Sequence, residues 1–171
     1  MKKIVIIFFV LICSPAVYAQ YDSLLCKPNE NTVFAFQLEN NKWVSINKEK
    51  TGKYLVYRFG NKDKIELQVP AVLDTTSRNR FLFSGYNRGG GKENAAMHFG
   101  YLSFRNKETV YEVYELWNSE DDIEHCGLTV MIDDKKPINL TGVLKNRHGN
   151  LLGLLYEEKV KKVAEEKTED N

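Results

Sequence analysis

The chain has 171 residues, 43% of them hydrophobic, and 24 basic residues nearly balance 23 acidic ones to leave a formal net charge of +1. This near-neutral balance gives no electrostatic reason to expect nucleic-acid binding, because proteins that bind nucleic acids are typically strongly basic. The length suits one domain, which can bury a core without a metal or a dense set of disulfides.

The first 19 residues predict a secretory signal peptide. Two lysines and an apolar stretch at residues 4–12 precede a small-residue cleavage site that ends at Ala19. Cleavage there would release a periplasmic protein that begins at Gln20. A lipoprotein anchored through Cys13 is not favoured, because Ile12 stands where a lipoprotein signal has a small residue. No later stretch has the roughly 20 apolar residues that a membrane-spanning helix needs.

Two cysteines, Cys26 and Cys126, follow the predicted cleavage site. In an oxidising compartment such an isolated pair predicts one disulfide. The bond would close a loop of about 100 residues and would contribute roughly 4–5 kcal/mol on the chain-entropy model. Two separate thiols are the alternative. A nucleophilic thiol is not expected, because export favours oxidation and no histidine with a suitable partner is indicated.

Residues 32–69 alternate apolar and polar positions with a period of two, which is typical of strands. Strand-like runs at about 34–38, 43–47, 53–59 and 64–69 are separated by turn residues and predict hairpins. Pro70 ends the fourth run, because proline cannot donate to a strand ladder. Further runs follow at 80–84, 97–104, 109–117, 126–132 and 137–142.

About nine strands with short connections and no helices between them predict an antiparallel all-β sandwich or small barrel over residues 20–156. The aromatic residues on these strands are expected to pack in the core or as cross-strand pairs. Leu151, Leu154, Leu155, Val160 and Val163 have helix-like spacing. They predict a C-terminal helix over about 151–166. Residues 157–171 are expected to form the charged end of this helix and a tail.

The segment SGYNRGGGKENAAMHF, residues 84–99, has three consecutive glycines between Arg88 and Lys92. It lacks the spacing of a phosphate-binding loop, and no hydroxyl residue follows its lysine. Glycines favour a flexible connection between two strands. Because tyrosine and arginine are enriched at protein interfaces, the loop is predicted to contact another protein through Ser84, Tyr86, Arg88 and Lys92. A solvated turn is the alternative.

No catalytic or metal-binding arrangement is recognised in the sequence, and no cofactor is predicted. His98, His125 and His148 are too far apart for the short-spaced ligand pairs of a zinc site. Glu112 and Glu115 lie on opposite faces of one predicted strand, and the G-x-S-x-G nucleophile motif does not occur. The chain is therefore predicted to bind rather than to catalyse.

Two strands, with Tyr57-Arg58-Phe59-Gly60 and Ile65-Glu66-Leu67 before Pro70, resemble those of a loose set of small exported proteins of Gram-negative bacteria. The resemblance covers about residues 26–152. It implies export and an all-β fold, and it brings no activity with it. The set has additional cysteines at the positions of Phe36, Asn47 and Leu140, so the resemblance implies that this chain lacks those further disulfides.

The stretch Ser84-Gly85-Tyr86 is similar, with a different spacing, to a loop by which periplasmic lysozyme inhibitors plug an enzyme cleft. We therefore expect a non-enzymatic inhibitor or immunity-type protein that neutralises an envelope-attacking enzyme, such as a lysozyme or a toxin. The alternative is an envelope module that binds a glycan or another small ligand on Trp43, Tyr101 or Trp117.

Overall fold

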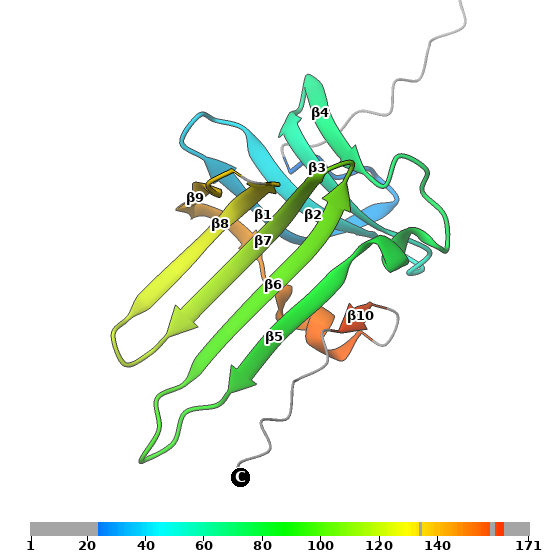
Figure 1. Ribbon diagram of the computed structural model, residues 1–171. Helices are drawn as coiled ribbons and strands as arrows, with labels where there is room; N and C mark the ends of the chain where they lie inside the picture. The colour runs from blue at the N-terminus through cyan, green and yellow to red at the C-terminus, as the bar shows by residue number, and fades with distance from the viewer. Residues whose placement is uncertain (1–23, 134, 158–159, 163–171) are drawn as a thin grey trace, which may run out of the picture.

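The computed structural model describes residues 24–133, 135–157 and 160–162 (Figure 1). The predicted signal peptide, residues 1–19, and most of the predicted tail, residues 157–171, lie outside these ranges. The strands are β1 (Glu30–Leu38), β2 (Trp43–Glu49), β3 (Leu55–Asn61), β4 (Lys64–Val69), β5 (Leu82–Arg88), β6 (Met97–Asn106), β7 (Thr109–Asn118), β8 (Ile123–Ile132), β9 (Ile138–Gly149) and β10 (Lys161–Lys162). Two 3-10 helices, η1 (Ser77–Arg80) and η2 (Leu151–Tyr156), complete the described elements.

The strands form one sheet with the order β10-β5-β6-β7-β8-β9-β1-β2-β3-β4. Neighbouring strands are antiparallel except β10 and β5, which are parallel. The long strand β9 connects the two halves of the sheet, since its first part pairs with β8 and its later part with β1. The sheet curls into a half-barrel (Figure 1). The all-β prediction is confirmed, but the sheet is mixed and not purely antiparallel.

The inner face of the half-barrel holds the hydrophobic core. Alternate residues of each strand point inward, and Phe34 and Phe36 on β1 and Leu102 and Phe104 on β6 are buried there. Tyr57 on β3 contacts Phe104 across the interior, with ring centroids 4.6 Å apart. The aromatic side chains thus bring strands from the two halves of the curled sheet together, and burial of their apolar surface stabilises the curl.

The predicted C-terminal helix over 151–166 is wrong within the described part of the chain. Residues Leu151–Tyr156 form the 3-10 helix η2, and Lys161 and Lys162 form the short strand β10. Leu151 and Leu154 are buried, and their spacing of three residues fits a 3-10 helix as well as an α-helix. Gly153 between them disfavours an α-helix by about 1 kcal/mol relative to alanine. Instead of continuing as an α-helix, this segment packs η2 against β5 and β6.

The predicted disulfide is not formed, because Cys26 and Cys126 are separate buried thiols. Cys26 lies before β1, whereas Cys126 lies in β8 next to Gly142 and Phe36. The Leu25 carbonyl oxygen, next to Cys26, accepts hydrogen bonds from Asn47 and Arg58 on the outer face of the sheet, whereas Cys126 lies opposite Glu115 on the inner face. The sheet therefore separates the two cysteines, and a disulfide needs Cα atoms within about 7 Å of each other.

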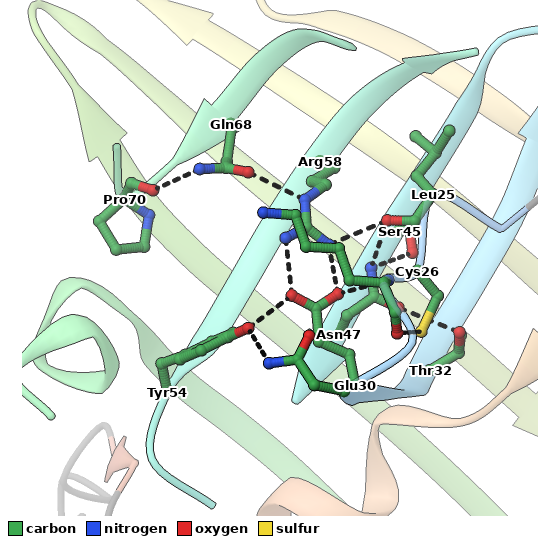
Figure 2. A network of polar contacts seen from close by, with 12 residues as sticks. Leu25, Cys26, Glu30, Thr32, Ser45, Asn47, Tyr54, Arg58, Gln68 and Pro70 are labelled. Atoms are coloured by element: carbon green, nitrogen blue, oxygen red, sulfur yellow. Dashed lines mark hydrogen bonds and ion pairs between the residues drawn. The ribbon is translucent and has the colours of Figure 1, made fainter. Parts of the chain in front are cut away.

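The strand motif behind the family resemblance supplies the arginine of a buried ion pair with Glu30 of β1 (Figure 2). Arg58 alternates with the inward Tyr57, so it lies on the opposite face of β3, yet its side chain is fully buried. It donates to Glu30 Oε1 at 2.7 Å and to the carbonyl oxygen of Leu25 at 2.9 Å. Tyr54 also donates to Glu30. These hydrogen bonds hold the segment before β1 against the outer face of β3.

The charge of Glu30 is compatible with this burial. Burial alone would raise the pKa of the Glu30 carboxyl, but hydrogen bonds from Arg58 and from the Lys27 N–H and the charge of Arg58 outweigh it and lower the pKa. Asn47 donates to the Leu25 carbonyl oxygen from β2. Part of the outer face in the N-terminal half is therefore covered by the chain itself.

Candidate functional site

The outer face of β5, β6 and β7 carries a strip of partly exposed aromatic rings, here called the aromatic strip: Tyr86, Phe99, Tyr101 and Tyr114. The register places Tyr86 opposite Phe99, and Tyr101 opposite Tyr114. Successive ring centroids lie 5.7, 5.8 and 6.5 Å apart. Rings at these distances support one another, so the strip is a preformed surface across three strands.

Strand alternation and one glycine explain why the strip lies on the outside. Phe83 points into the core, so Tyr86 points away from it. Gly127 lies opposite Tyr114 in the neighbouring strand β8, and a Cβ atom at this position would overlap the Tyr114 hydroxyl. The tyrosine therefore lies across the glycine and covers its backbone. Burial raises the pKa of the Tyr114 hydroxyl, which remains neutral at physiological pH.

The aromatic strip gathers apolar rings on an outer face that also carries polar residues, such as Ser103, Glu112 and His125. Tyr86 is 41% exposed, and Leu82 and Ile123, which share the outer face, are 40% and 37% exposed. The N-terminal half differs, because there the segment before β1 covers the outer face through Arg58. Leu82 and Ile123 lie apart from each other on this face, whereas the four rings of the aromatic strip are neighbours. Neighbouring apolar side chains that reach the surface mark interaction sites. The outer face of β5–β7 is therefore the best candidate for a binding surface.

A pocket of about 490 Å³ lies where the aromatic strip meets the outer edge of β5. Its lining combines residues of β5 and β6 with Leu155 of η2 and Lys162 of β10. Lys162 donates to the carbonyl oxygen of Glu157 at 2.8 Å, and its ammonium group lies 5.4 Å from the centre of the Phe83 ring. The pocket thus has aromatic walls and one fixed cation.

The β5–β6 loop, residues 89–96, forms a second and more polar pocket of about 700 Å³. The Gly91 N–H donates to the Asn94 carbonyl oxygen at 2.9 Å, which closes a turn at the tip. Arg88 donates through Nε to the carbonyl oxygen of Ala95 at 3.1 Å, so its guanidinium group is held at the base of the loop. Lys92 lines the same pocket.

The three glycines of the loop are not required by its backbone conformation. None of them has a positive φ, and a Cβ atom at Gly89 or Gly91 would meet no atom within 4 Å. Only Gly90 is crowded, by Ala96 at 3.2 Å. The glycines therefore affect the flexibility of the loop more than its shape.

The four residues predicted to bind a partner fall into two adjoining groups. Ser84, Tyr86 and Arg88 alternate along the outer face of β5. Ser84 and Tyr86 line the pocket beside the aromatic strip, whereas Arg88 and Lys92 line the loop pocket. The structure thus brings them to one side of the molecule, and it adds Phe99, Tyr101 and Tyr114, which only the strand register could bring together.

The aromatic residues of the glycan alternative do not converge. Trp43 lies on β2 against His148, with centroids 5.8 Å apart. Trp117 stacks on His98 at 5.6 Å on the inner face of β6 and β7. Tyr101 belongs to the aromatic strip. A glycan site would need stacking platforms on one concave surface, so this arrangement does not favour that alternative.

The sequence analysis considers Glu115 only as a possible partner of Glu112, and it does not predict the unusual environment of this residue. Glu115 on β7 is fully buried on the inner face, where it accepts a hydrogen bond from the Leu151 N–H. Its Oε2 atom lies 3.7 Å from Arg147 and has no hydrogen-bond partner among the described residues, like Nε2 of His98. Burial raises the pKa of Glu115 to about 7. Its inward position in the alternating run TVYEVYELW is the signal that could have identified it.

The environment of Glu115 does not amount to a metal site. Within the described residues, no three His, Cys, Asp or Glu side chains are grouped so that they could hold a metal ion. Arg147 instead bridges Glu115 and Glu124, with its Nη2 atom 2.6 Å from Glu124 Oε1. Burial and the charge of Arg147 lower the pKa of His98, so its imidazole is neutral at physiological pH.

Among the described residues, no helix has both the length and the apolar character needed to span a lipid bilayer. Comparison with protein-family models, with curated proteins and with solved structures gives no match to this chain. The geometry of the aromatic strip and the β5–β6 loop is therefore the basis for a functional assignment.

Proposed function

We propose that the protein binds another protein through the aromatic strip and the β5–β6 loop. In this role it would act as an exported inhibitor or immunity-type protein against an envelope-attacking enzyme. The observation that carries the proposal is the exposed Tyr86 ring, which continues the aromatic strip and lies between the two pockets. Exposed tyrosines beside arginines are the residues that dominate binding energy at protein interfaces.

The two parts of the surface would contribute in different ways. The aromatic strip offers apolar area on a rigid sheet, so little side-chain entropy is lost on binding. Arg88 and Lys92 place two cations at the base and tip of the loop, where they would meet acidic residues in the cleft of the target enzyme. Such charges mainly raise the association rate and the specificity.

The proposal is tested by capture from envelope extracts with the wild type and with a triple variant, Tyr86→Ser, Arg88→Ser and Lys92→Ser. Loss of one central tyrosine costs about 2 kcal/mol at an interface, which is about 30-fold in affinity. We expect the triple variant to lose the captured enzyme, and purified wild-type protein to slow that enzyme in a cell-wall lysis assay.

The matched control removes one exposed apolar residue and two lysines elsewhere: Val72→Ser, Lys62→Ser and Lys64→Ser. Val72 is 72% exposed, Lys62 lies in the turn between β3 and β4, and Lys64 begins β4. This variant should capture the enzyme like the wild type. Equal retention of a partner by the wild type and the Tyr86 triple variant would refute the proposed surface.

A further inference from the structure

Glu115 and the helix η2 share a buried contact on the inner face of the sheet. The Oε1 atom of Glu115 accepts a hydrogen bond from the N–H of Leu151, the first residue of η2. Gly100 lies opposite Glu115 in β6, and the Leu151 Cβ atom lies 3.0 Å from the position that a Cβ atom of Gly100 would take. The start of η2 therefore lies over the carboxyl group and helps to shield it from water.

The second oxygen of this carboxyl group lacks a hydrogen bond. Within the described residues, Oε2 has no donor at hydrogen-bond distance. The Nη1 atom of Arg147 is 3.7 Å away, while its Nη2 atom lies 2.6 Å from Glu124 Oε1. A buried charge is costly when its hydrogen bonds are not all made. The contact between Glu115 and η2 is thus suited to a protonated carboxyl group and poorly suited to a carboxylate.

We propose that the packing of η2 on the sheet is pH-sensitive, because η2 is held while Glu115 is protonated and is released more readily once Glu115 ionises. Release of η2 would let water reach Oε2 and solvate the charge. The opposing contribution is largely apolar, since Leu151 and Leu154 are buried beneath η2. Burial of apolar surface does not depend on pH, so the ionisation of Glu115 alters the balance.

The charged and titratable groups around Glu115 come from β8 and β9. Cys126 lies opposite Glu115 in β8, Glu124 lies two residues before it, and Arg147 of β9 bridges the two carboxyl groups. β6 contributes a glycine, Gly100, at the opposite position. Burial raises the pKa of the Cys126 thiol to about 11, so this thiol does not titrate between pH 5 and pH 8.

The pH dependence has a definite sign. Burial raises the pKa of Glu115 from 4.5 to about 7, and release of η2 would return it toward 4.5. Below about pH 4.5 the carboxyl is protonated in both forms, and between about pH 4.5 and pH 7 the released form loses its proton first. Packing of η2 therefore weakens as the pH rises. His98 and Lys162 would act in the opposite direction, because burial lowers the pKa of each.

The test is hydrogen exchange of the Leu151 amide in the purified protein from pH 5 to pH 8, expressed as a protection factor relative to an unstructured amide at each pH. We expect this factor to fall by up to about 70-fold over the range, as pKa values of 4.5 and about 7 require for the packing equilibrium. In Glu115→Gln, which keeps an oxygen to accept from Leu151, the factor should not fall.

The matched control is Glu112→Gln, on the same strand. Burial also raises the pKa of Glu112, but this residue lies on the outer face, opposite Ser103 and Thr129. It should keep the pH dependence of the wild type. Amides of β3 serve as a reference for opening of the whole sheet, and they should be better protected than Leu151 at every pH.

Four results overturn the proposal. The first is a wild-type protection factor at Leu151 that is constant or rises with pH, which needs no variant to be observed. The second is a fall that persists in Glu115→Gln, and the third is a fall that Glu112→Gln abolishes. The fourth is equal protection of Leu151 and β3 at every pH, because η2 would then open only with the whole sheet.

The pH-sensitive contact and the proposed function can fail separately. η2 contributes Leu155 to the pocket beside Tyr86, so its release would change that border of the candidate binding surface. Only this consequence rests on the proposed function. Exchange at Leu151 is measured on the purified protein alone, whereas capture is measured against envelope extracts, so each experiment can refute one proposal and leave the other standing.

Discussion

Glu115→Gln is expected to stabilise the protein at neutral and higher pH and to change its stability little at pH 4. Burial raises the pKa of the Glu115 carboxyl from its usual 4.5 to about 7. Below pH 4.5 the carboxyl is protonated in the folded and the unfolded chain. Between about pH 4.5 and pH 7 the unfolded chain loses this proton first, so the free energy of unfolding falls as the pH rises.

The size of the effect follows from the same values. The rise from 4.5 to about 7 is about 2.5 pH units, and each unit corresponds to about 1.36 kcal/mol. Between about pH 4.5 and pH 7, the free energy of unfolding of the wild type therefore falls by about 3 kcal/mol. That of the glutamine variant does not fall, because glutamine does not ionise. This is an upper value, because Arg147, 3.7 Å from Oε2, loses a charged partner in the variant. Glutamine retains an oxygen that can accept from the Leu151 N–H.

The measurement is urea unfolding of both proteins at pH 4, 6 and 8, with extrapolation to zero denaturant. We expect the difference in free energy of unfolding to grow with pH by up to about 3 kcal/mol. Glu120→Gln removes one carboxylate from the exposed turn after β7 and controls for net charge. The groups that face Glu115 are Arg147, Glu124 and Cys126. A difference that is constant from pH 4 to pH 8 would refute the reasoning.

Three further outcomes are expected. Arg58→Met should lower the free energy of unfolding in urea by about 3–5 kcal/mol, because Glu30 would stay buried without its partner; adding Glu30→Gln should recover most of the loss. Gly60→Ala should cost more than about 2 kcal/mol, because φ is +142° and the new Cβ would overlap the Lys64 carbonyl oxygen, whereas Gly91→Ala should be neutral. A thiol reductant should leave the melting temperature unchanged, because the two buried cysteines are separate; a lower value with reductant would contradict this.

The strand pattern is largely readable from the sequence, because alternation reports directly on which residues face a core. Val113, for example, is buried and Tyr114 beside it is half-buried on the outer face, as their alternation predicts. The curl of the sheet is not readable in this way. It depends on β9 pairing with two strands that are distant in the sequence, and local patterns carry no information about such pairing.

The incorrect predictions of a C-terminal helix and of a disulfide have a common cause. Both predictions use residue types and their spacing along the sequence, which do not give the distances between side chains in the folded chain. Leu151 and Leu154 have the spacing of a helix face, but a single 3-10 turn is enough to bury both. Two cysteines in a chain predicted to be exported suggest a bond, but the segment with Cys26 lies on the outer face of the sheet and Cys126 on the inner face.

The sequence alone predicts only part of the candidate site. Ser84, Tyr86, Arg88 and Lys92 could be selected because they flank an unusual glycine run. Their neighbours in the aromatic strip come from other strands, and only the cross-strand register of β5, β6 and β7 reveals them. Glu115 was named but judged by its spacing from Glu112, whereas its burial depends on η2 packing over the sheet.

The shared strand β9 has a consequence for how the chain folds. Gln37 on β1 accepts a hydrogen bond from Asn146 on β9, across 109 residues of sequence. The hairpins β1–β4 and β5–β8 can each form from local contacts, but they can join only after the last strands are present. Contacts across such long loops slow folding, so folding is expected to be completed only after nearly the whole chain has emerged.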